Sequence, residues 1–338
     1  MNNNFTGKHG PLLIAEIGGN HEGDFDYARQ LVKLAIESDV DFVKFQIYTG
    51  DGLVSSVESP QRNQHFKKFE LSKNQHLELA DMIIEAGIGY TSSVWDIGSL
   101  NWIDNKISVY KIGSGDLTAH PILKATAEIG KPIILSTGLS TEQEVLESVD
   151  FIQSVNPLYK QPDQLALLQC TSMYPIPVSD AHLNVMGRLK ELTGLTVGYS
   201  DHTEGSTTLK YAVAMGADIL EFHFTDSREN KEFRDHKVSL TKYEVQDLIN
   251  EIKLIGQLKG KGTKRPLPIE LSNEHVTSFR RAVYPSKDIE AGEVFSEENL
   301  TVLRPNHGID ARSFAEVLGK KAKKPLIKGQ KLNWDDLD

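Results

Sequence analysis

Two histidines follow consecutive predicted strands at the same point, where a short apolar run gives way to a polar turn. His202 follows the run 196–199, and His223 follows the run 218–222. The residues between these runs have the apolar spacing of a helix, so we expect neighbouring parallel strands with both imidazoles at one edge. A single histidine is more often a core or loop residue. Two neutral imidazoles at one edge predict a site for a divalent metal.

Charged and hydroxyl side chains follow the other predicted strands in the same way. Lys44 and Lys111 lie inside apolar strands, where a positive charge is costly unless it meets an anion or a carboxylate. Several of these strands lead into glycine turns, whose backbone amides can cradle an anion. Each residue alone has a simpler explanation, since Lys44 can pair with Glu16 and serines commonly cap helices. The polar residues that recur at these strand ends are Glu16, Lys44, Gln46, Lys111, Ser114, Ser136, Thr171 and Ser200. The two lysines and the hydroxyl groups among them, beside glycine turns, indicate a phosphate or carboxylate site.

Strands and helices alternate through the first three quarters of the chain. Helical patterns occupy 25–37, 75–86 and 243–258, and another begins at residue 141. Residues 48–70 are predicted to form a long polar loop with a functional role. Eight strand–helix units over about 250 residues predict the α/β class and a TIM (β/α)8 barrel, whose carboxyl-terminal rim carries the chemistry. The predicted strands, some with their turns, are 12–15, 42–46, 89–94, 108–112, 131–138, 165–175, 196–199 and 218–222.

Composition narrows the class of protein. The net charge of −10 argues against a nucleic-acid partner, and the apolar runs are too short for a membrane span. The single cysteine, Cys170, excludes an intrachain disulfide and is typical of a reducing compartment. Residues 1–10 read as a polar arm without the apolar core of a signal peptide. We therefore expect a soluble, cytoplasmic protein.

The pattern changes after residue 260. Residues 261–276 are broken by glycine and proline and are predicted to form a linker, and 277–338 contain short strands and turns. About 60 residues suffice for a small, marginally stable domain. We therefore expect a barrel in 1–260 and a small domain in 277–338 that docks on the barrel or on a partner chain.

Eight motifs in a fixed order carry a family resemblance. They are IAEIGGNHEG at 14–23, VKFQ at 43–46, YKIGSGD at 110–116, KPIILSTG at 131–138, CTSMYP at 170–175, SDHT at 200–203, EFHFT at 221–225 and DHKVSL at 235–240. Together they resemble the sialic acid (N-acetylneuraminate) synthase family over nearly the whole chain. The tail, with IEAG at 289–292 and RPNHGI at 304–309, is similar to the antifreeze-like SAF domain that ends these enzymes. The resemblance therefore implies a TIM barrel followed by a small β-rich SAF domain.

The resemblance also implies roles for particular residues. His202 and His223 correspond to ligands of a divalent cation, Mn²⁺ or Mg²⁺. Glu16 and Gln46 fall near the reacting carbons and are the predicted catalytic residues. Arg304 matches an arginine that reaches the partner subunit's active site, which implies a domain-swapped homodimer. The phosphoenolpyruvate-binding positions are Lys44, Lys111, Ser114, Ser136 and Ser200, and the sugar-binding positions are Tyr174, Asp235 and Arg304.

The implied enzyme condenses phosphoenolpyruvate with an N-acylated aminosugar to give a nonulosonic acid and phosphate. N-acetylmannosamine is the expected acceptor. Ser172 departs from the asparagine common in N-acetylneuraminate synthases, and Asp116 and the pair Phe233-Arg234 depart from residues found in other members of the family. A legionaminic- or pseudaminic-type acceptor is therefore an alternative. A metal-dependent aldolase on the same barrel is a further alternative. A non-catalytic carbohydrate-binding protein is another, but it would not need buried lysines and paired histidines at strand ends.

Overall fold

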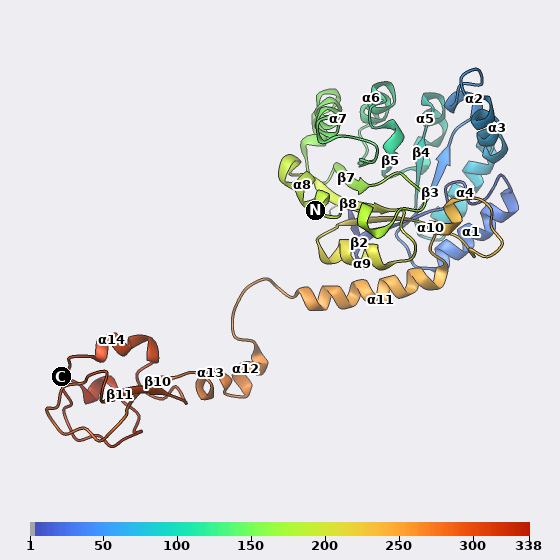
Figure 1. Ribbon diagram of the computed structural model, residues 1–338. Coiled ribbons are helices and arrows are strands. Elements are labelled where there is room, and N and C mark those ends of the chain that lie inside the picture. The colour runs from blue at the N-terminus through green and yellow to red at the C-terminus, as the bar shows by residue number, and fades with distance from the viewer. Residues whose placement is uncertain (1–3) are drawn as a thin grey trace. The chain divides into compact units, whose positions relative to one another are not determined.

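The computed structural model describes residues 4–338. The chain divides into two compact units, Met1–Gly260 and Lys261–Asp338 (Figure 1). Each unit has its own hydrophobic core. Within the described residues, no helix is long and apolar enough to cross a membrane.

The first unit is a closed parallel barrel. Each strand pairs in parallel with the next, and the last strand pairs back with the first of the eight. This topology confirms the predicted TIM barrel. The strands are β2 (Gly10–Glu16), β3 (Phe42–Ile47), β4 (Gly89–Val94), β5 (Tyr110–Ile112), β6 (Ile133–Ser136), β7 (Leu165–Cys170), β8 (Thr196–Asp201) and β9 (Ile219–His223).

Amphipathic helices surround the barrel (Figure 1). In α1, Ala28, Leu31, Val32 and Ala35 recur at helical spacing and are buried against the sheet. The side chain of Asp24 caps the first turn by accepting a hydrogen bond from the Tyr27 amide, which fixes where the chain leaves the rim. The outer helices are α1 (Phe25–Glu37), α4 (Lys73–Glu85), α5 (Ile97–Ile103), α6 (His120–Ile129), α7 (Glu142–Val155), α8 (Asn184–Thr193), α9 (Thr207–Ala214) and α11 (Lys242–Lys259).

The barrel interior is apolar below the rim. A separate buried cluster is formed by Phe5, Leu12, Ile14, Val109, Ile134, Ala166, Leu168 and Ile219. The prediction of a polar arm at residues 1–10 is therefore wrong in part. Phe5 is buried, and β1 (Thr6–Gly7) pairs antiparallel with the start of β2. Apolar side chains fill the interior of the barrel, so the polar side chains at the carboxyl ends of the strands can face only the open rim.

The prediction of a loop at residues 48–70 is also wrong. This segment contains α2 (Gly50–Leu53) and α3 (Pro60–Phe69). The buried amide of Asn63 in α3 donates hydrogen bonds to the carbonyls of Gly50 and Val54, which joins the two helices. The sequence hides α3 because the helix is mostly polar and presents no clear apolar stripe. The shorter elements of this unit are α10 (Asp235–Val238) and the 3₁₀ turns η1 (Asp104–Lys106), η2 (Ser114–Asp116), η3 (Pro157–Lys160) and η4 (Val178–Asp180).

The second unit is built around one antiparallel strand pair, β10 (Ala282–Pro285) and β11 (Leu300–Leu303). Its core contains Val283, Phe295 and Leu332. The region predicted as a linker, residues 261–276, contains α12 (Pro268–Ser272) and the start of α13 (His275–Ser278). The other elements are η5 (Ala311–Ser313), α14 (Phe314–Val317) and η6 (Trp334–Asp336).

Candidate active site

Strand register brings three of the predicted residues side by side. Glu16 on β2 lies opposite Lys44 on β3 and opposite His223 on β9. Partners at one level of a parallel sheet point to the same face, so all three side chains enter the barrel mouth. All three are buried. A carboxylate, an ammonium group and an imidazole therefore converge where the barrel closes.

A second carboxylate, Glu221, completes a buried charge cluster. Lys44 forms an ion pair with Glu16, and its Nζ lies 3.7 Å from a Glu221 carboxylate oxygen. The Nζ of Lys111 lies 3.4 Å from the other Glu221 oxygen. The hydroxyl of Ser200 donates a hydrogen bond to Glu221 at 2.9 Å. Two ammonium groups and two carboxylates thus balance one another in a region of low dielectric.

Burial and charge shift the proton affinities in this cluster. Burial lowers the pKa of Lys44 to about 8; Glu221 opposes that shift and Lys111 adds to it. Burial works against ionisation of Glu221, but Lys111 and Lys44 outweigh it, so the pKa of Glu221 lies below its usual value. An incoming anion would therefore meet one ammonium group that is held charged at neutral pH mainly by its carboxylate neighbours.

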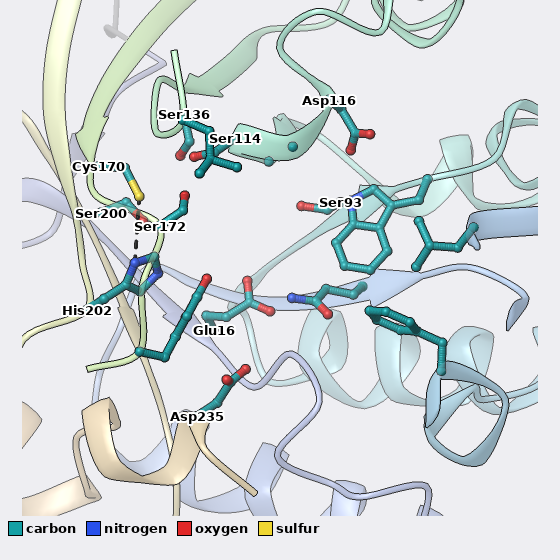
Figure 2. Close-up of a pocket in the computed structure, with 18 of the residues that line it drawn as sticks. Glu16, Ser93, Ser114, Asp116, Ser136, Cys170, Ser172, Ser200, His202 and Asp235 are labelled. Atoms are coloured by element: carbon teal, nitrogen blue, oxygen red, sulfur yellow. Dashed lines mark hydrogen bonds between the residues drawn. The ribbon is translucent and has the colours of Figure 1, made fainter. Parts of the chain in front are cut away.

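The charge cluster opens into a pocket of about 760 Å³ at the rim (Figure 2). Thr171 is a predicted site residue that does not line it, since its hydroxyl donates to the Asp180 carbonyl oxygen. Arg304 belongs to the second unit, where its guanidinium lies 5.6 Å from the centre of the Phe279 ring. In Figure 2, Ser114, Ser136 and Ser200 gather at one side of the pocket, Asp235 lies at the opposite side, and Glu16 lies between them. The predicted residues that line the pocket are Glu16, Lys44, Gln46, Lys111, Ser114, Ser136, Tyr174, Ser200, His202, His223 and Asp235.

The two histidines lie together on the pocket wall. Their ring centres are 5.4 Å apart, and the Tyr174 ring lies 4.0 Å from that of His202. The Nδ1 atom of His202 lies 2.7 Å from the Thr171 carbonyl oxygen, so this nitrogen is the natural donor and Nε2 is left with its lone pair. The Nδ1 atom of His223 is buried without a hydrogen-bond partner in the described chain.

These imidazoles fit a divalent cation. Burial, with His202 and Lys44 nearby, holds the pKa of His223 well below its usual value, so this ring is neutral and its lone pair is available. Burial also disfavours protonated His202, but Cys170, Thr171 and Glu221 outweigh this and raise its pKa. Within residues 4–338, no cluster of three or more His, Cys, Asp or Glu side chains is arranged to hold a metal. The two histidines therefore suit a cation that takes its other ligands from water or substrate.

Hydroxyl groups crowd around one glycine on the side of the pocket opposite Asp235. Lys111 Nζ donates to the Ser136 hydroxyl at 2.7 Å, and the Gly138 amide donates to the Ser114 hydroxyl at 3.0 Å. A Cβ atom placed on Gly138 would lie 2.4 Å from the Ser172 hydroxyl and 2.8 Å from that of Ser114. The absence of a side chain at Gly138 is therefore needed for these hydroxyls and the Lys111 ammonium to surround one small space, which suits an anion.

Glu16 and Gln46 meet over another glycine. Gly18 has a φ of +52°, and a Cβ atom there would lie 2.7 Å from Glu16 Oε1 and 3.3 Å from Gln46 Nε2. Glu16 Oε1 has no hydrogen-bond partner within residues 4–338. The Glu16 carboxylate, a hydrogen-bond acceptor, and the Gln46 amide nitrogen, a donor, thus face the same point beside Gly18, close to the charge cluster.

Sequence reasoning missed several residues that line the pocket. Glu221 was part of a recognised motif, and its spacing of two residues from His223 on one strand could have shown that both point inward. The sequence does not indicate Arg62 and His65, because they lie on α3, in a segment that the sequence predicts to be a loop. The thiol of Cys170 also lines the pocket, 3.8 Å from His202 Nδ1.

Comparisons with known proteins agree with this architecture. Residues 31–264 match the NeuB family and residues 280–338 match the SAF domain. The chain is 36% identical to an uncharacterized protein of Methanocaldococcus jannaschii over 98% of this chain and 96% of that protein. It is also 36% identical to the N,N'-diacetyllegionaminic acid synthase of Campylobacter jejuni, over 93% of this chain and 96% of that enzyme.

A solved structure shows the same fold. The N-acetylneuraminic acid (sialic acid) synthetase of Leptospira borgpetersenii superimposes with a TM-score of 0.72 at 29% identity, over 78% of this chain and 90% of that one. A parallel barrel with charged strand ends and an appended SAF domain defines a class of synthases, and this chain belongs to the NeuB family. The prediction of an enzyme from this family, which condenses phosphoenolpyruvate in making nonulosonic acids, is confirmed at the level of the family.

Proposed function

We propose that this enzyme condenses phosphoenolpyruvate with an N-acylated aminosugar to give a nonulosonic acid and phosphate. The observation that carries the proposal is the buried cluster of Lys44, Lys111, Glu16 and Glu221 beside the paired histidines. The cluster supplies cations for an anionic substrate and a carboxylate for proton transfer in one water-poor pocket. In this proposal residues 1–260 form the catalytic domain, 261–276 connect it, and 277–338 act as the accessory SAF domain.

Phosphoenolpyruvate binds at the side of the pocket that contains the serines. Its negative charges replace part of the contact that Glu16 and Glu221 make with Lys44 and Lys111, so both ammonium groups stay paired when substrate enters. Ser114 and Ser136 supply hydroxyl donors around the same space as the Gly138 turn, and Ser200 joins them when its hydroxyl turns from Glu221 to the substrate. The ligand therefore satisfies donors that have few other partners.

The acceptor sugar binds between this anion site and Asp235. His202 and His223 would hold a divalent cation, Mn²⁺ or Mg²⁺. When bound, the cation supplies Lewis-acid polarisation of the acceptor's carbonyl group. Tyr174 packs against the rings of both histidines and limits where the sugar can lie. Asp235 is buried, and its Oδ1 lies 3.4 Å from Arg234 Nε, so this ion pair faces the sugar and can exchange hydrogen bonds with it.

Glu16 and Gln46 then act on water. The electrons of the phosphoenolpyruvate double bond form a bond from carbon 3 to the acceptor's aldehyde carbon, and the aldehyde oxygen takes a proton and becomes a hydroxyl group. Carbon 2 of phosphoenolpyruvate then becomes electron-poor. Gln46 orients a water molecule toward carbon 2, and Glu16 takes the proton as the water oxygen bonds there. The hydroxyl group on the resulting tetrahedral carbon then loses its proton, carbon 2 becomes a ketone, and phosphate leaves with the bridging oxygen and accepts that proton. Lys44 and Lys111 stabilise the charge on the departing phosphate.

N-acetylmannosamine is the acceptor expected from the sequence. The similarity to a synthase of N,N'-diacetyllegionaminic acid supports a second candidate, a deoxysugar with two N-acetyl groups. Both candidates share the reacting aldehyde and the neighbouring acylamino group, so they use the same mechanism. We also propose a cytoplasmic, domain-swapped homodimer in which Arg304 completes the partner's site.

Phosphate release tests this function directly. Purified protein is incubated with phosphoenolpyruvate, Mn²⁺ and each aminosugar in turn, with and without EDTA. We expect release that requires an aminosugar and stops with EDTA. Activity with free pyruvate would favour an aldolase instead. Folded protein that releases no phosphate with any acceptor would favour a carbohydrate-binding protein.

A further inference from the structure

Three buried polar side chains lie behind the pocket rather than in its lining. They are Asn20, Thr225 and His236, and each is fully buried. Asn20 belongs to the turn after β2, and the other two belong to the segment that follows β9. A buried polar group costs free energy unless it is hydrogen-bonded. The bonds that these side chains make therefore show which parts of the chain they hold together.

Asn20 makes the first connection between the turn after β2 and the segment after β9. Its amide nitrogen donates to the Phe224 carbonyl oxygen at 2.9 Å and to the Ser239 hydroxyl at 2.8 Å. The Ser239 hydroxyl in turn donates to the carbonyl oxygen of Asp235 at 2.7 Å. Phe224 directly follows His223 in the chain. One amide group therefore fixes the backbone next to His223 and, through Ser239, the backbone of Asp235.

His236 makes the second connection between the same two segments. Its Nε2 atom lies 3.1 Å from a carboxylate oxygen of Glu22, in the turn after β2, and its Nδ1 atom lies 2.7 Å from the Thr225 hydroxyl oxygen. Burial holds the pKa of this imidazole below its usual value, although Glu22 opposes the shift. A neutral ring with its proton on Nε2 satisfies both partners, since Nδ1 then accepts the hydroxyl proton. Both nitrogens of His236 are thus used in holding the chain.

The two connections flank Asp235 in a helix that is too short to hold itself. α10 is only four residues long, and the side chain of its N-cap residue, Arg234, makes no capping hydrogen bond within the described chain. One helical turn is unstable by itself, because few bonds offset the entropy cost of forming it. The position of Asp235 therefore depends on the contacts of His236, which follows it, and of Ser239, which accepts from Asn20.

A small shift of Asp235 would change the surroundings of the cation site. Its Oδ2 atom lies 3.8 Å from His223 Nδ1, too far for a hydrogen bond but close enough for a charge interaction in a buried pocket. The same region is tied to the end of β2, since the Phe224 amide donates to the Glu16 carbonyl oxygen at 2.8 Å. The two connections thus hold Glu16, His223 and Asp235 in one arrangement.

We propose that Asn20 and His236 are positioning residues that hold Asp235 in place by joining the turn after β2 to the segment after β9. The proposal rests on the synthase function proposed above, which places the acceptor sugar at Asp235 and the cation at His223. Neither positioning residue lines the pocket, so neither touches substrate. The anion site at Gly138 lies on the turns after β5 and β6, to which neither residue bonds within the described chain. Their loss should therefore weaken the binding of sugar and cation and spare phosphoenolpyruvate.

His236→Phe and His236→Gln test the second connection. The phenyl ring fills the space without a polar atom, whereas the glutamine amide keeps an N–H donor near the position of Nε2. We expect His236→Phe to raise both KM for the aminosugar that supports phosphate release and the dissociation constant for Mn²⁺ by roughly tenfold, with KM for phosphoenolpyruvate changed by less than about threefold. His236→Gln should recover most of this loss. The Mn²⁺ constant is measured by titration calorimetry on protein without substrates, so it does not depend on turnover.

Asn20→Leu tests the first connection and should show the same selective change. Thr225→Val is a milder variant, because it removes only the hydroxyl partner of His236, and it carries the test if His236→Phe does not fold. His120→Phe is the matched control, since His120 is exposed on α6 outside the pocket. It should leave all three constants unaffected. Thermal unfolding of each variant separates a change in binding from a loss of fold.

Unchanged constants for the sugar and for Mn²⁺ in the folded variants, or equal losses for both substrates, would overturn the positioning role while leaving the synthase function intact. A His236→Gln enzyme as impaired as His236→Phe would also contradict it. Absence of phosphate release from the unchanged enzyme would instead contradict the synthase function, and the Mn²⁺ titrations would then decide whether the two connections act on the cation site.

Discussion

At the scale of single residues, the site depends on four buried charges that compensate one another. Lys44 is the member with two carboxylate neighbours, Glu16 and Glu221. Removing its charge would leave Lys111 alone to balance both carboxylates, and the pocket would repel an anion. Both the binding of the anionic substrate and the stabilisation of the departing phosphate should therefore become weaker.

We therefore expect Lys44→Met to lower the rate of phosphate release by a factor on the order of a hundred or more. Lys33→Met is the matched control, since Lys33 is exposed on α1. Circular dichroism should show that both variants are folded. Near-normal turnover in folded Lys44→Met would remove Lys44 from the proposed mechanism.

The lowered pKa of Lys44 gives a pH dependence. Since burial lowers it to about 8, the ammonium group loses its proton as pH rises through that value. We expect kcat/KM for phosphoenolpyruvate to fall above about pH 8, because this parameter reports the free enzyme. A profile measured from about pH 6 to about pH 10 checks this, and a flat alkaline limb would contradict it.

The free energy of unfolding should rise over the same pH interval in which activity falls. Between about pH 8 and the ordinary lysine value of about 10.4, the unfolded chain binds more protons at this group than the folded protein does. The cost of burying charged Lys44 is fully present below this window and disappears as pH rises through it. Denaturant unfolding at each pH thus distinguishes lost activity from lost structure.

Part of this site could be predicted from residue types alone. The lysines were recognisable because a charge inside an apolar strand is costly unless it is paired, and the histidines because they follow two consecutive strands at the same point. Glu221 escaped notice because a carboxylate inside a strand becomes meaningful only when its partners, Lys44 and Lys111, are placed by the barrel. Ion pairs between distant strands depend on closure of the barrel, which no local pattern contains.

At the scale of elements, the ends of the barrel strands and the turns after them determine the geometry of the pocket. The eight barrel strands were predictable because buried parallel strands are short apolar runs bounded by turns. The helices α2 and α3 were not, since their stability comes from the buried side chain of Asn63 and from aromatic contacts rather than from an apolar stripe. The missed helices form one wall of the pocket.

The turn after β6 provides a test at this scale. Gly138→Ala would push a methyl group against the hydroxyls of Ser172 and Ser114. We expect KM for phosphoenolpyruvate to rise by roughly tenfold, because about 1.4 kcal/mol of lost binding corresponds to that factor. Gly187→Ala on α8 is the control, since a Cβ atom there would meet nothing within 4 Å. An unchanged KM in Gly138→Ala would mean that phosphoenolpyruvate does not bind at this turn.

At the scale of the whole molecule, the chain has two compact units, and only the first contains the pocket. The SAF domain was recognisable from its motifs, and the short strands predicted for it include the paired strands β10 and β11. The role of Arg304 stays a prediction that the family resemblance supplies. It concerns the assembly of two chains, which a single chain does not reveal.

Mixing two inactive variants tests the domain-swapped dimer. Arg304→Ala lacks the predicted accessory arginine, and Lys44→Met lacks a functional barrel. In a swapped dimer, a mixed pair contains one site with an intact barrel and an intact arginine from the partner. We expect co-refolded mixtures to recover roughly a quarter of normal activity. No recovery beyond the two separate variants would contradict the swap.

The most direct test of the central claim follows the oxygen atoms. The enzyme is incubated with phosphoenolpyruvate, Mn²⁺ and the preferred aminosugar in water labelled with heavy oxygen, and both products are weighed by mass spectrometry. We expect a nonulosonic acid with the summed carbon skeleton and a phosphate without label, because water attacks carbon 2 and the bridging oxygen leaves with phosphorus. Labelled phosphate, or phosphate formed without a joined product, would contradict the proposed synthase.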